Sequence, residues 1–285
     1  MKFEIMFSLM SKYPVSKMAA FLGVTKQGYY KWRKRRANPC KDVSLLIHIR
    51  DQYEKSEYAY GSPRIYRALR MANIRCGKYR VERLMRMHKI RAISSRKFKI
   101  QTTQSAHEFP ISDNLLKQDF SANAPNRVWV SDITFIRARN RWLYLCVIVD
   151  LYSRKVVGWK VSRQIDTSLV TAALMAAIKT RNPAPGLILH SDRGSQYASA
   201  EFRAMLKEHS FVSSMSRKAN CYDNACAESI FATLKKERLS HMKFEDIHDA
   251  QKEIFKYIEL FYNRKRLHST LNYLSPEEFE TQNVA

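Results

Sequence analysis

The sequence has 285 residues, with 50 Lys plus Arg against 26 Asp plus Glu, a formal net charge of +24 and a pI of about 9.9. Because 45% of the residues are hydrophobic, a disordered basic tail is excluded, and a chain of this length can form two domains. The longest apolar run, Trp142–Val149, is too short for a membrane span. Glu4 interrupts the N-terminal apolar stretch and no small-residue cleavage site follows, which argues against a signal peptide.

The positive charge is concentrated in the N-terminal part of the chain. Residues 1–100 contain 25 basic and 6 acidic residues, a net charge of +19, whereas residues 101–285 contain 25 and 20, a net charge of +5. The first part is typical of a nucleic-acid-binding region, with mere solubility as the alternative. The second part has the charge balance of an ordinary globular enzyme. The five cysteines form no CxxC pair, so we expect free thiols in a reducing compartment and no structural zinc.

Residues 1–40 are predicted to contain a helix-turn-helix-like segment. Ser16 is expected to cap a short helix that ends at Gly23, and Thr25 is expected to cap a second helix containing Tyr29 and Trp32. The basic residues 31–36 would then reach DNA phosphates. A helical hairpin that only packs against its neighbours is the alternative.

Residues 41–96 are predicted to form a second basic helical module. Gly61, Ser62 and Pro63 precede one expected helix, and the turn at residues 76–78 precedes another. Arginines recur every third residue along both helices, which places them on one face of each helix. They are Arg64, Arg67 and Arg70 on the first helix and Arg80, Arg83 and Arg86 on the second. These faces predict contact with the DNA backbone, with a simply solvated face as the alternative.

Residues 97–124 lose hydrophobic periodicity and are predicted to be a linker. Residues 125–285 are predicted to form one α/β domain with a helical C-terminal tail. The expected strands are 128–136, 142–150, 155–161, 186–190 and 211–215. The expected helices are 168–179, capped near Thr167, 199–209 and 224–239. Three antiparallel strands followed by alternating helices and strands indicate a mixed sheet.

Four acidic residues lie within or beside apolar segments of this domain. Asp132 lies within the strand WVSDITFI, Asp150 ends an apolar run, Asp192 follows a short strand, and Glu228 lies on a half-apolar helix. Carboxylates in such places are costly without cations, and Mg²⁺ prefers oxygen ligands, so a divalent metal site is predicted among them. Unrelated surface acids are the alternative.

The spacing and the flanking words resemble a known family. There are 59 residues between Asp132 and Asp192 and 35 between Asp192 and Glu228, and the second interval is the D-D-(35)-E spacing of retroviral-type integrases. The catalytic, downstream-frame transposases of the insertion sequence three family are similar in the words DLYSRKVVGW, HSDRGSQY, DNACAESIFATLKKE and FYNRKRLHSTLNYLSPEEF. The words YGSPRIYRALR and YRVERLMRMHKIRA extend the resemblance to the N-terminal part.

The resemblance implies a ribonuclease-H-like integrase core with a mixed five-stranded sheet. It implies a DNA transposase in which Asp132, Asp192 and Glu228 hold two Mg²⁺ or Mn²⁺ ions. Water would cleave the phosphodiester at the transposon end, and the freed 3′-hydroxyl would attack another phosphodiester in an in-line strand transfer. Lys235 matches a basic position of the family. Lys235, Arg264, Arg266 and His268 are further candidates for DNA contact, with fold support as the alternative for the segment YNRKRLHSTL.

Three further polar residues invite a site role. Asp150 lies at a junction between a strand and a turn, and Asp223 is expected to be the N-cap of the Glu228 helix, so neither is assigned to the site. His190 is a general-base candidate, but metal-bound water needs no histidine, which favours a structural or DNA-orienting role.

Two other functions share parts of this pattern. One is a DNA-binding regulator with an inactive nuclease core, and the other is a nuclease acting on RNA–DNA hybrids. The expected partners of a transposase are transposon-end and target DNA, further copies of the chain on DNA, and an upstream-frame helix-turn-helix protein or its frameshift fusion. No sustained heptads occur here. The expected location is the bacterial cytoplasm, in association with the nucleoid and away from the membrane.

Overall fold

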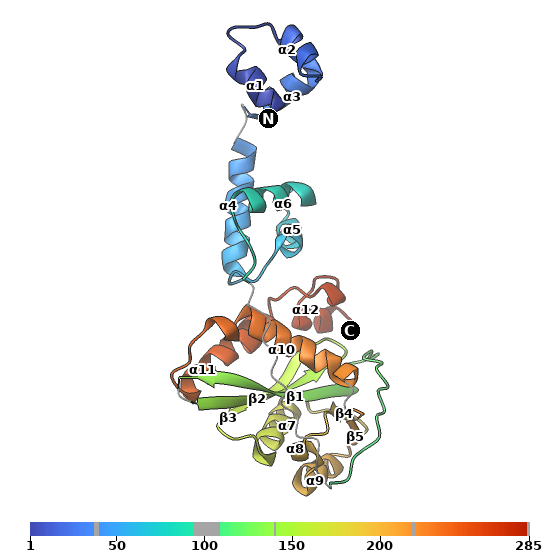
Figure 1. Ribbon diagram of the computed structural model, residues 1–285. Helices are drawn as coiled ribbons and strands as arrows, with labels where there is room; N and C mark the ends of the chain where they lie inside the picture. The colour runs from blue at the N-terminus through green and yellow to red at the C-terminus, as the bar shows by residue number, and fades with distance from the viewer. Residues whose placement is uncertain (37–39, 94–108, 140, 218–220, 284–285) are drawn as a thin grey trace. The chain divides into compact units, whose positions relative to one another are not determined.

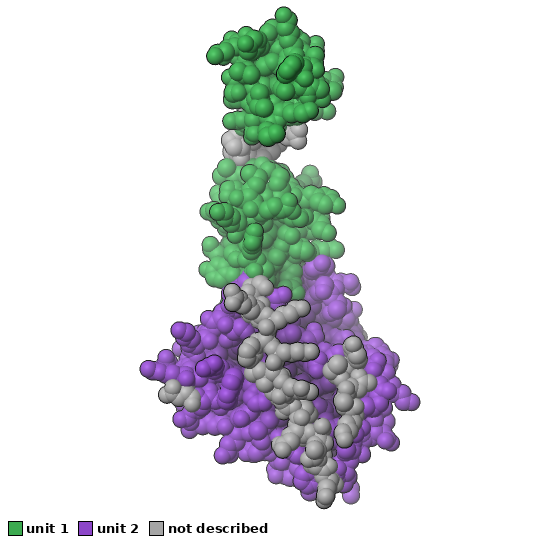
Figure 2. Space-filling model, viewed as in Figure 1, with its two compact units in different colours: residues 1–92 green, residues 93–285 purple. Residues whose placement is uncertain are grey.

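A computed structural model describes residues 1–36, 40–93, 109–139, 141–217 and 221–283. The chain forms two compact units, residues 1–92 and 93–285 (Figure 2). Within the described ranges no helix is long and apolar enough to span a membrane. Part of the predicted linker lies outside the described residues, and its described part, residues 109–124, belongs to the second unit.

The first unit begins with three short helices, α1 (Lys2–Ser8), α2 (Val15–Phe21) and α3 (Lys26–Arg36). Met6, Met18 and Tyr29 form their buried centre, and aromatic residues pack around it. The Thr25 hydroxyl accepts a hydrogen bond from the Gly28 N–H at 3.0 Å, as predicted for a cap. The prediction that Ser16 caps this helix was wrong, because α2 begins at Val15 with Pro14 in the N-cap position, so Ser16 is its second residue. The helix α1 was not predicted.

Three further helices complete the first unit. They are α4 (Cys40–Lys55), α5 (Ser62–Met71) and α6 (Lys78–Met87). The two predicted basic helices are α5 and α6, and Gly61 and Gly77 occupy their N-cap positions. The apolar sides of the three helices meet in a buried core, since each of them packs against the other two. That core contains Leu45, Ile49, Ile65, Leu69, Val81, Leu84 and Met85.

The second unit is built on a five-stranded mixed sheet with strand order β3-β2-β1-β4-β5. The strands are β1 (Val128–Ala138), β2 (Arg141–Asp150), β3 (Val156–Ser162), β4 (Ile188–Ser191) and β5 (Val212–Met215). The first three strands pair antiparallel, whereas β4 and β5 continue the sheet in parallel with β1. This is the predicted ribonuclease-H-like architecture. The strand β2 is an almost continuous apolar run because both of its faces are covered.

Helices cover both faces of this sheet (Figure 1). The helices α7 (Thr167–Arg181), α8 (Ser195–Ala198) and α9 (Ala200–Glu208) lie on one face, over the main apolar core. The helices α10 (Ala225–Glu237) and α11 (Ile247–Phe255) lie on the other face. The remaining elements are η1 (Cys221–Asn224), η2 (Leu239–His241), the π-helical η3 (Lys256–Tyr262), η4 (Ser269–Leu271) and α12 (Pro276–Asn283).

The contact between β3 and α7 depends on the absence of a side chain at Gly158. A Cβ atom there would lie 2.5 Å from the Ala173 carbonyl oxygen and 2.7 Å from the Ala177 Cβ. Because helix backbone cannot move aside locally, Gly158→Ala is expected to destabilise the protein by about 1–3 kcal/mol. Urea unfolding followed by tryptophan fluorescence measures the change. Gly77→Ala meets no atom within 4 Å and should cost less, under about 1 kcal/mol. Equal losses for both variants would contradict the packing argument.

Candidate active site

The three predicted carboxylates come from three elements that meet at the middle of the sheet. Asp132 lies within β1, Asp192 directly follows β4, and Glu228 lies in the first turn of α10. The strands β1 and β4 are neighbours, and α10 packs against β1. Burial raises the pKa of Asp132 well above its usual range, and the negative charges of Asp192 and Glu228 raise it further. The fold therefore brings the three acids into electrostatic contact.

Local backbone contacts orient two of these carboxylates. Asp132 Oδ1 accepts a hydrogen bond from the Ile133 N–H at 2.8 Å, and Asp192 Oδ1 accepts one from the Gly194 N–H at 2.9 Å. Glu228 is exposed on α10. These contacts hold the two aspartate side chains in place.

Lys235 lies two helical turns after Glu228 and is half-buried. Burial lowers the pKa of its ammonium group, and the nearby Asp132 charge opposes that change. Lys235 therefore lies close enough to Asp132 for the carboxylate charge to affect its pKa, and it lies on the helix that also carries Glu228.

The chemistry of this donor set fits hard divalent cations, because it consists of carboxylate oxygens whose mutual repulsion a cation would relieve. In the described part of the chain, no group of three His, Cys, Asp or Glu side chains is already closed around one ion position. The charges of the three acids therefore influence one another, but the side chains do not form a preformed metal site. Mutual repulsion between carboxylates is consistent with this arrangement.

His190 is fully buried in β4, two residues before Asp192, and it is held by hydrogen bonds on both ring nitrogens. Its Nε2 lies 2.9 Å from the Asp223 carbonyl oxygen, and its Nδ1 lies 2.8 Å from the Ser214 hydroxyl. Since a carbonyl only accepts, Nε2 carries the proton and Ser214 donates to Nδ1. Burial lowers the pKa of His190, which favours the neutral form of the ring. This environment favours the structural role over the general base.

The prediction that Asp223 caps the Glu228 helix was wrong. Asn224 occupies the N-cap position of α10 and makes no side-chain capping bond. The Asp223 carboxylate instead bonds Arg217 and Gln118. The predicted cap near Thr167 is confirmed, since Asp166 is the N-cap of α7 and accepts from the Leu169 N–H. The difference at Asp223 arises because capping depends on the direction of the backbone, which the sequence pattern alone leaves open.

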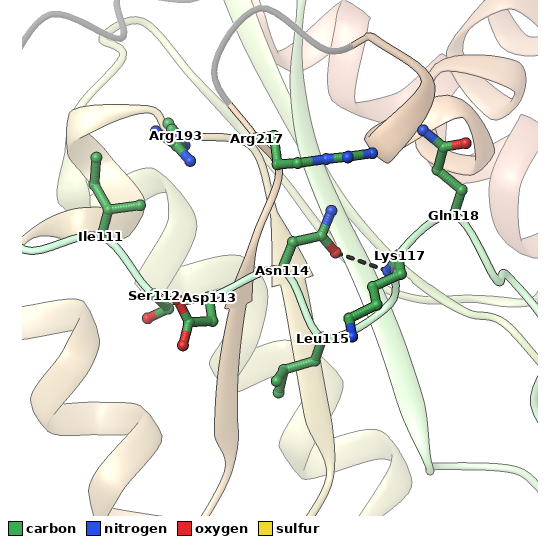
Figure 3. A pocket seen from close by; sticks show the side chains of 9 residues that line it. All are labelled: Ile111, Ser112, Asp113, Asn114, Leu115, Lys117, Gln118, Arg193 and Arg217. Atoms are coloured by element: carbon green, nitrogen blue, oxygen red, sulfur yellow. Dashed lines mark hydrogen bonds between the residues drawn. The ribbon is translucent and has the colours of Figure 1, made fainter.

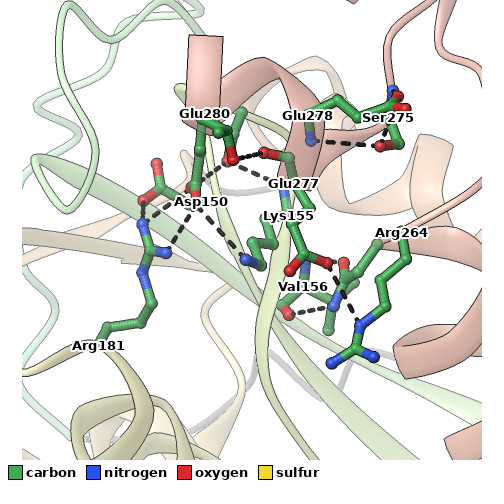
Figure 4. A network of polar contacts seen from close by, with 12 residues as sticks. Asp150, Lys155, Val156, Arg181, Arg264, Ser275, Glu277, Glu278 and Glu280 are labelled. Carbon is green, nitrogen blue, oxygen red and sulfur yellow. Dashed lines mark hydrogen bonds and ion pairs between the residues drawn. The ribbon is translucent and has the colours of Figure 1, made fainter. Parts of the chain in front are cut away.

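Asp150 belongs to a buried polar network that fixes the C-terminal helix to the core. Its carboxylate accepts from the Asn126 and Tyr152 N–H groups at 2.8 and 3.0 Å, and Arg181 lies 3.4 Å away. Arg181 also forms two 2.8 Å bonds to Glu280 of α12, which faces it in Figure 4. The partners of Asp150 are therefore structural, in line with leaving it out of the site.

The C-terminal candidates for DNA contact lie in different environments. Arg266 and His268 are buried, and the Arg266 guanidinium binds Glu237 through Nε at 2.8 Å and Nη2 at 2.7 Å. Arg264 is exposed and pairs with Glu277. These contacts favour the fold-support alternative for Arg266 and His268.

Among the basic candidates of the first unit, Arg64, Arg80 and Arg83 make contacts within the protein. Arg80 and Arg83 both bind Asp42 of α4, at 2.6 and 2.8 Å, and both guanidinium groups remain partly exposed. Arg64 stacks over the Tyr60 ring, and Arg67 is exposed on α5. The Asp42 pairs orient two arginines toward the same side of the helices without burying their charge.

A groove of about 830 Å³ is lined by the segment before β1 and by residues that follow β4 and β5 (Figure 3). One wall is the described segment 111–118, and Arg193 and Arg217 contribute from the ends of β4 and β5. Arg193 directly follows Asp192, and its Nε donates to the Ser216 carbonyl oxygen at 2.6 Å. Sequence analysis missed both arginines. The signal was available for Arg193, which stands inside the word HSDRGSQY.

Comparisons with known proteins identify the modules. Two family models described as "Integrase core domain" match residues 122–221 and 228–284, and one described as "HTH-like domain" matches residues 41–98. The "Insertion element IS600 uncharacterized 31 kDa protein" of Shigella sonnei is 39% identical over 264 residues, which cover 92% of this chain and 97% of that protein. "Transposase InsF for insertion sequence IS3A" of Escherichia coli strain K12 is 38% identical over 289 residues, covering 100% of both.

Two solved structures are similar over part of the chain. The catalytic core domain of HTLV-2 integrase in complex with magnesium, in its trimeric form, has a TM-score of 0.42 and 15% identity, and covers 56% of this chain and 99% of that chain. The catalytic domain of Mos1 mariner transposase has a TM-score of 0.41 and 14% identity, and covers 47% and 70%.

The mixed sheet, the HTH-like module and the integrase-core matches define a transposase of the polynucleotidyl transferase class. More narrowly, the chain belongs to the IS3 family of insertion-sequence transposases, because it is 38% identical over its whole length to a member of that family.

Proposed function

We propose that this chain cleaves the phosphodiester at the ends of its own insertion sequence and transfers the freed 3′-hydroxyl to target DNA. The observation that carries the proposal is the placement of Asp132, Asp192 and Glu228 on three adjoining elements of an integrase core, in β1, directly after β4 and in the first turn of α10. The family's D-D-(35)-E spacing supports the same three residues.

Two Mg²⁺ or Mn²⁺ ions bound by these acids would stabilise the attacking and leaving oxygens of an in-line displacement. The chain itself supplies the rest. The Ile133 and Gly194 N–H groups hold the two aspartate side chains, and the first turn of α10 carries Glu228. Lys235, on the same helix, is placed to bind a DNA phosphate beside the cluster. Arg193, which lines the groove, would bind the adjoining strand.

The test is an assay of the purified chain on labelled duplexes that carry the element's own ends. We expect a nick with a 3′-hydroxyl, followed by a joined product, in Mg²⁺ or Mn²⁺ and neither product after chelation. The assay with and without the upstream-frame protein shows whether that partner is needed. Binding without any cleavage would favour the regulator, and preferred cutting of RNA–DNA hybrids would favour the hybrid nuclease.

The first unit is proposed to bind the transposon ends through the basic faces of α5 and α6. Copies of the chain are proposed to assemble on DNA, in the bacterial cytoplasm and in association with the nucleoid. An HTH-like match over residues 41–98 and the exposed arginines support this role. Arg64, Arg67, Arg80 and Arg83 are the proposed contacts.

Arg67→Gln tests the basic face of α5. Loss of one phosphate contact should weaken binding at all sequences and reduce the slope of log Kd against log salt by about 1. Fluorescence anisotropy at several salt concentrations measures both quantities. Arg139→Gln is the matched control, because Arg139 is an exposed arginine of the second unit that pairs with Glu245. An unchanged slope for Arg67→Gln would remove Arg67 from the DNA interface.

A further inference from the structure

The Asp223 carboxylate is completely buried and receives four hydrogen bonds. Arg217 donates three of them, from its backbone N–H at 2.8 Å and from Nε and Nη2 at 3.0 Å each. Gln118 donates the fourth, from Nε2 at 3.2 Å. The Arg217 side chain holds the pKa of Asp223 far below its usual range. We call Asp223, Arg217 and Gln118 the clasp.

The clasp connects a strand end with a helix start. Arg217 lies two residues beyond the last residue of β5, and Asp223 lies two residues before the first residue of α10. The first turn of α10 carries Glu228. The side chain of its N-cap, Asn224, makes no capping bond, so α10 does not anchor its own beginning in the usual way. The clasp supplies that anchor.

The clasp is also joined to the strand that leads to Asp192. The Asp223 carbonyl accepts from His190 Nε2, and His190 lies on β4 two residues before Asp192. The hydroxyl of Ser214 donates to His190 Nδ1 and accepts from the Leu115 N–H at 2.9 Å. A continuous chain of hydrogen bonds therefore links the segment of Leu115 and Gln118, the strands β4 and β5, and the start of α10.

We propose that Asp223 is a positioning residue for the transposase reaction, because the clasp sets where Glu228 stands relative to Asp192. This inference rests on the proposed function. Its physical basis is the sensitivity of in-line chemistry to geometry, since a displacement of about 1 Å can cost a hundredfold in rate. Gln118 gives the segment before the core a direct contact with the same carboxylate.

Asp223→Asn tests the proposal, because an amide keeps the shape and loses the charge that receives the Arg217 donors. We expect the single-turnover cleavage rate at saturating DNA to fall about 10- to 100-fold while the Kd for DNA stays within about twofold. Mn²⁺ binding, followed by electron paramagnetic resonance, should weaken as well. Arg217→Gln added to Asp223→Asn should cause little further loss, because both changes break one contact.

Asp246→Asn is the matched control, since Asp246 is a carboxylate that caps α11 through the Asp249 N–H. It should leave the rate and Mn²⁺ affinity unchanged. If Asp223→Asn does not fold, Arg217→Lys carries the test, with a smaller loss of rate in a folded protein. Wild-type rate and Mn²⁺ affinity in the folded variant would overturn the proposal. If the wild-type chain itself fails to cleave, the proposed function fails, and the Mn²⁺ affinities still decide on the clasp.

Discussion

Asp192→Asn and Glu228→Gln are each expected to abolish cleavage of the transposon end and leave DNA binding intact. Each change removes one negative charge from the cluster and keeps the size of the side chain. In Asp192→Asn, the amide oxygen can still accept from the Gly194 N–H that now binds Oδ1. We expect a loss of several hundredfold or more, on the order of the loss from removing one group that stabilises a transition state.

The measurement is a time course of 3′-hydroxyl formation and of strand transfer on labelled ends. Anisotropy with the same duplexes measures binding, which should match the wild-type value because the first unit is untouched. Glu201→Gln, on the exposed side of α9, is the control for removing a carboxylate from the same unit. Full strand transfer by both site variants would exclude these residues as metal ligands.

The carboxylate cluster could be proposed from the sequence because its acids lie within or beside apolar segments, and because the 35-residue interval between Asp192 and Glu228 matches the spacing of the family. Asp132 stands inside a strand pattern, and Glu228 stands on a helix whose face includes Lys235 at a seven-residue interval. The sheet was predictable for a similar reason, since a run such as Trp142–Val149 forms a strand wherever both faces are covered. The pairing directions follow from the lengths of the connections. Short connections join the antiparallel strands β1, β2 and β3, whereas helices connect β3 to β4 and β4 to β5, which allows parallel pairing.

The contacts of Asp223 could not be predicted from the sequence. Its position before a helix is typical of an N-cap, and only the fold reveals that Gln118, which is 105 residues away, bonds the same carboxylate. The helix α1 was missed because its seven residues carry little periodicity and depend on aromatic packing from Tyr29 and Trp32. Tertiary partners decide both cases, and local patterns do not encode them.

Arg266→Ala is expected to destabilise the second unit rather than weaken DNA binding. Arg266 and Glu237 are 6% and 8% exposed, and two hydrogen bonds join them. Tyr257 donates a third bond to Glu237 at 2.8 Å. Removing the guanidinium leaves a buried carboxylate without its counter-charge, at a cost of about 3–5 kcal/mol.

Urea unfolding and anisotropy with transposon ends separate the two roles of Arg266, because fold support and DNA contact change different quantities. Arg264→Ala is the matched control, since Arg264 forms an exposed pair with Glu277 and should cost about 0–1 kcal/mol. In the double variant Arg266→Met and Glu237→Met, apolar side chains replace the pair, which should restore most of the lost stability. An Arg266→Ala protein with wild-type stability and weaker DNA binding would instead place Arg266 at the DNA interface.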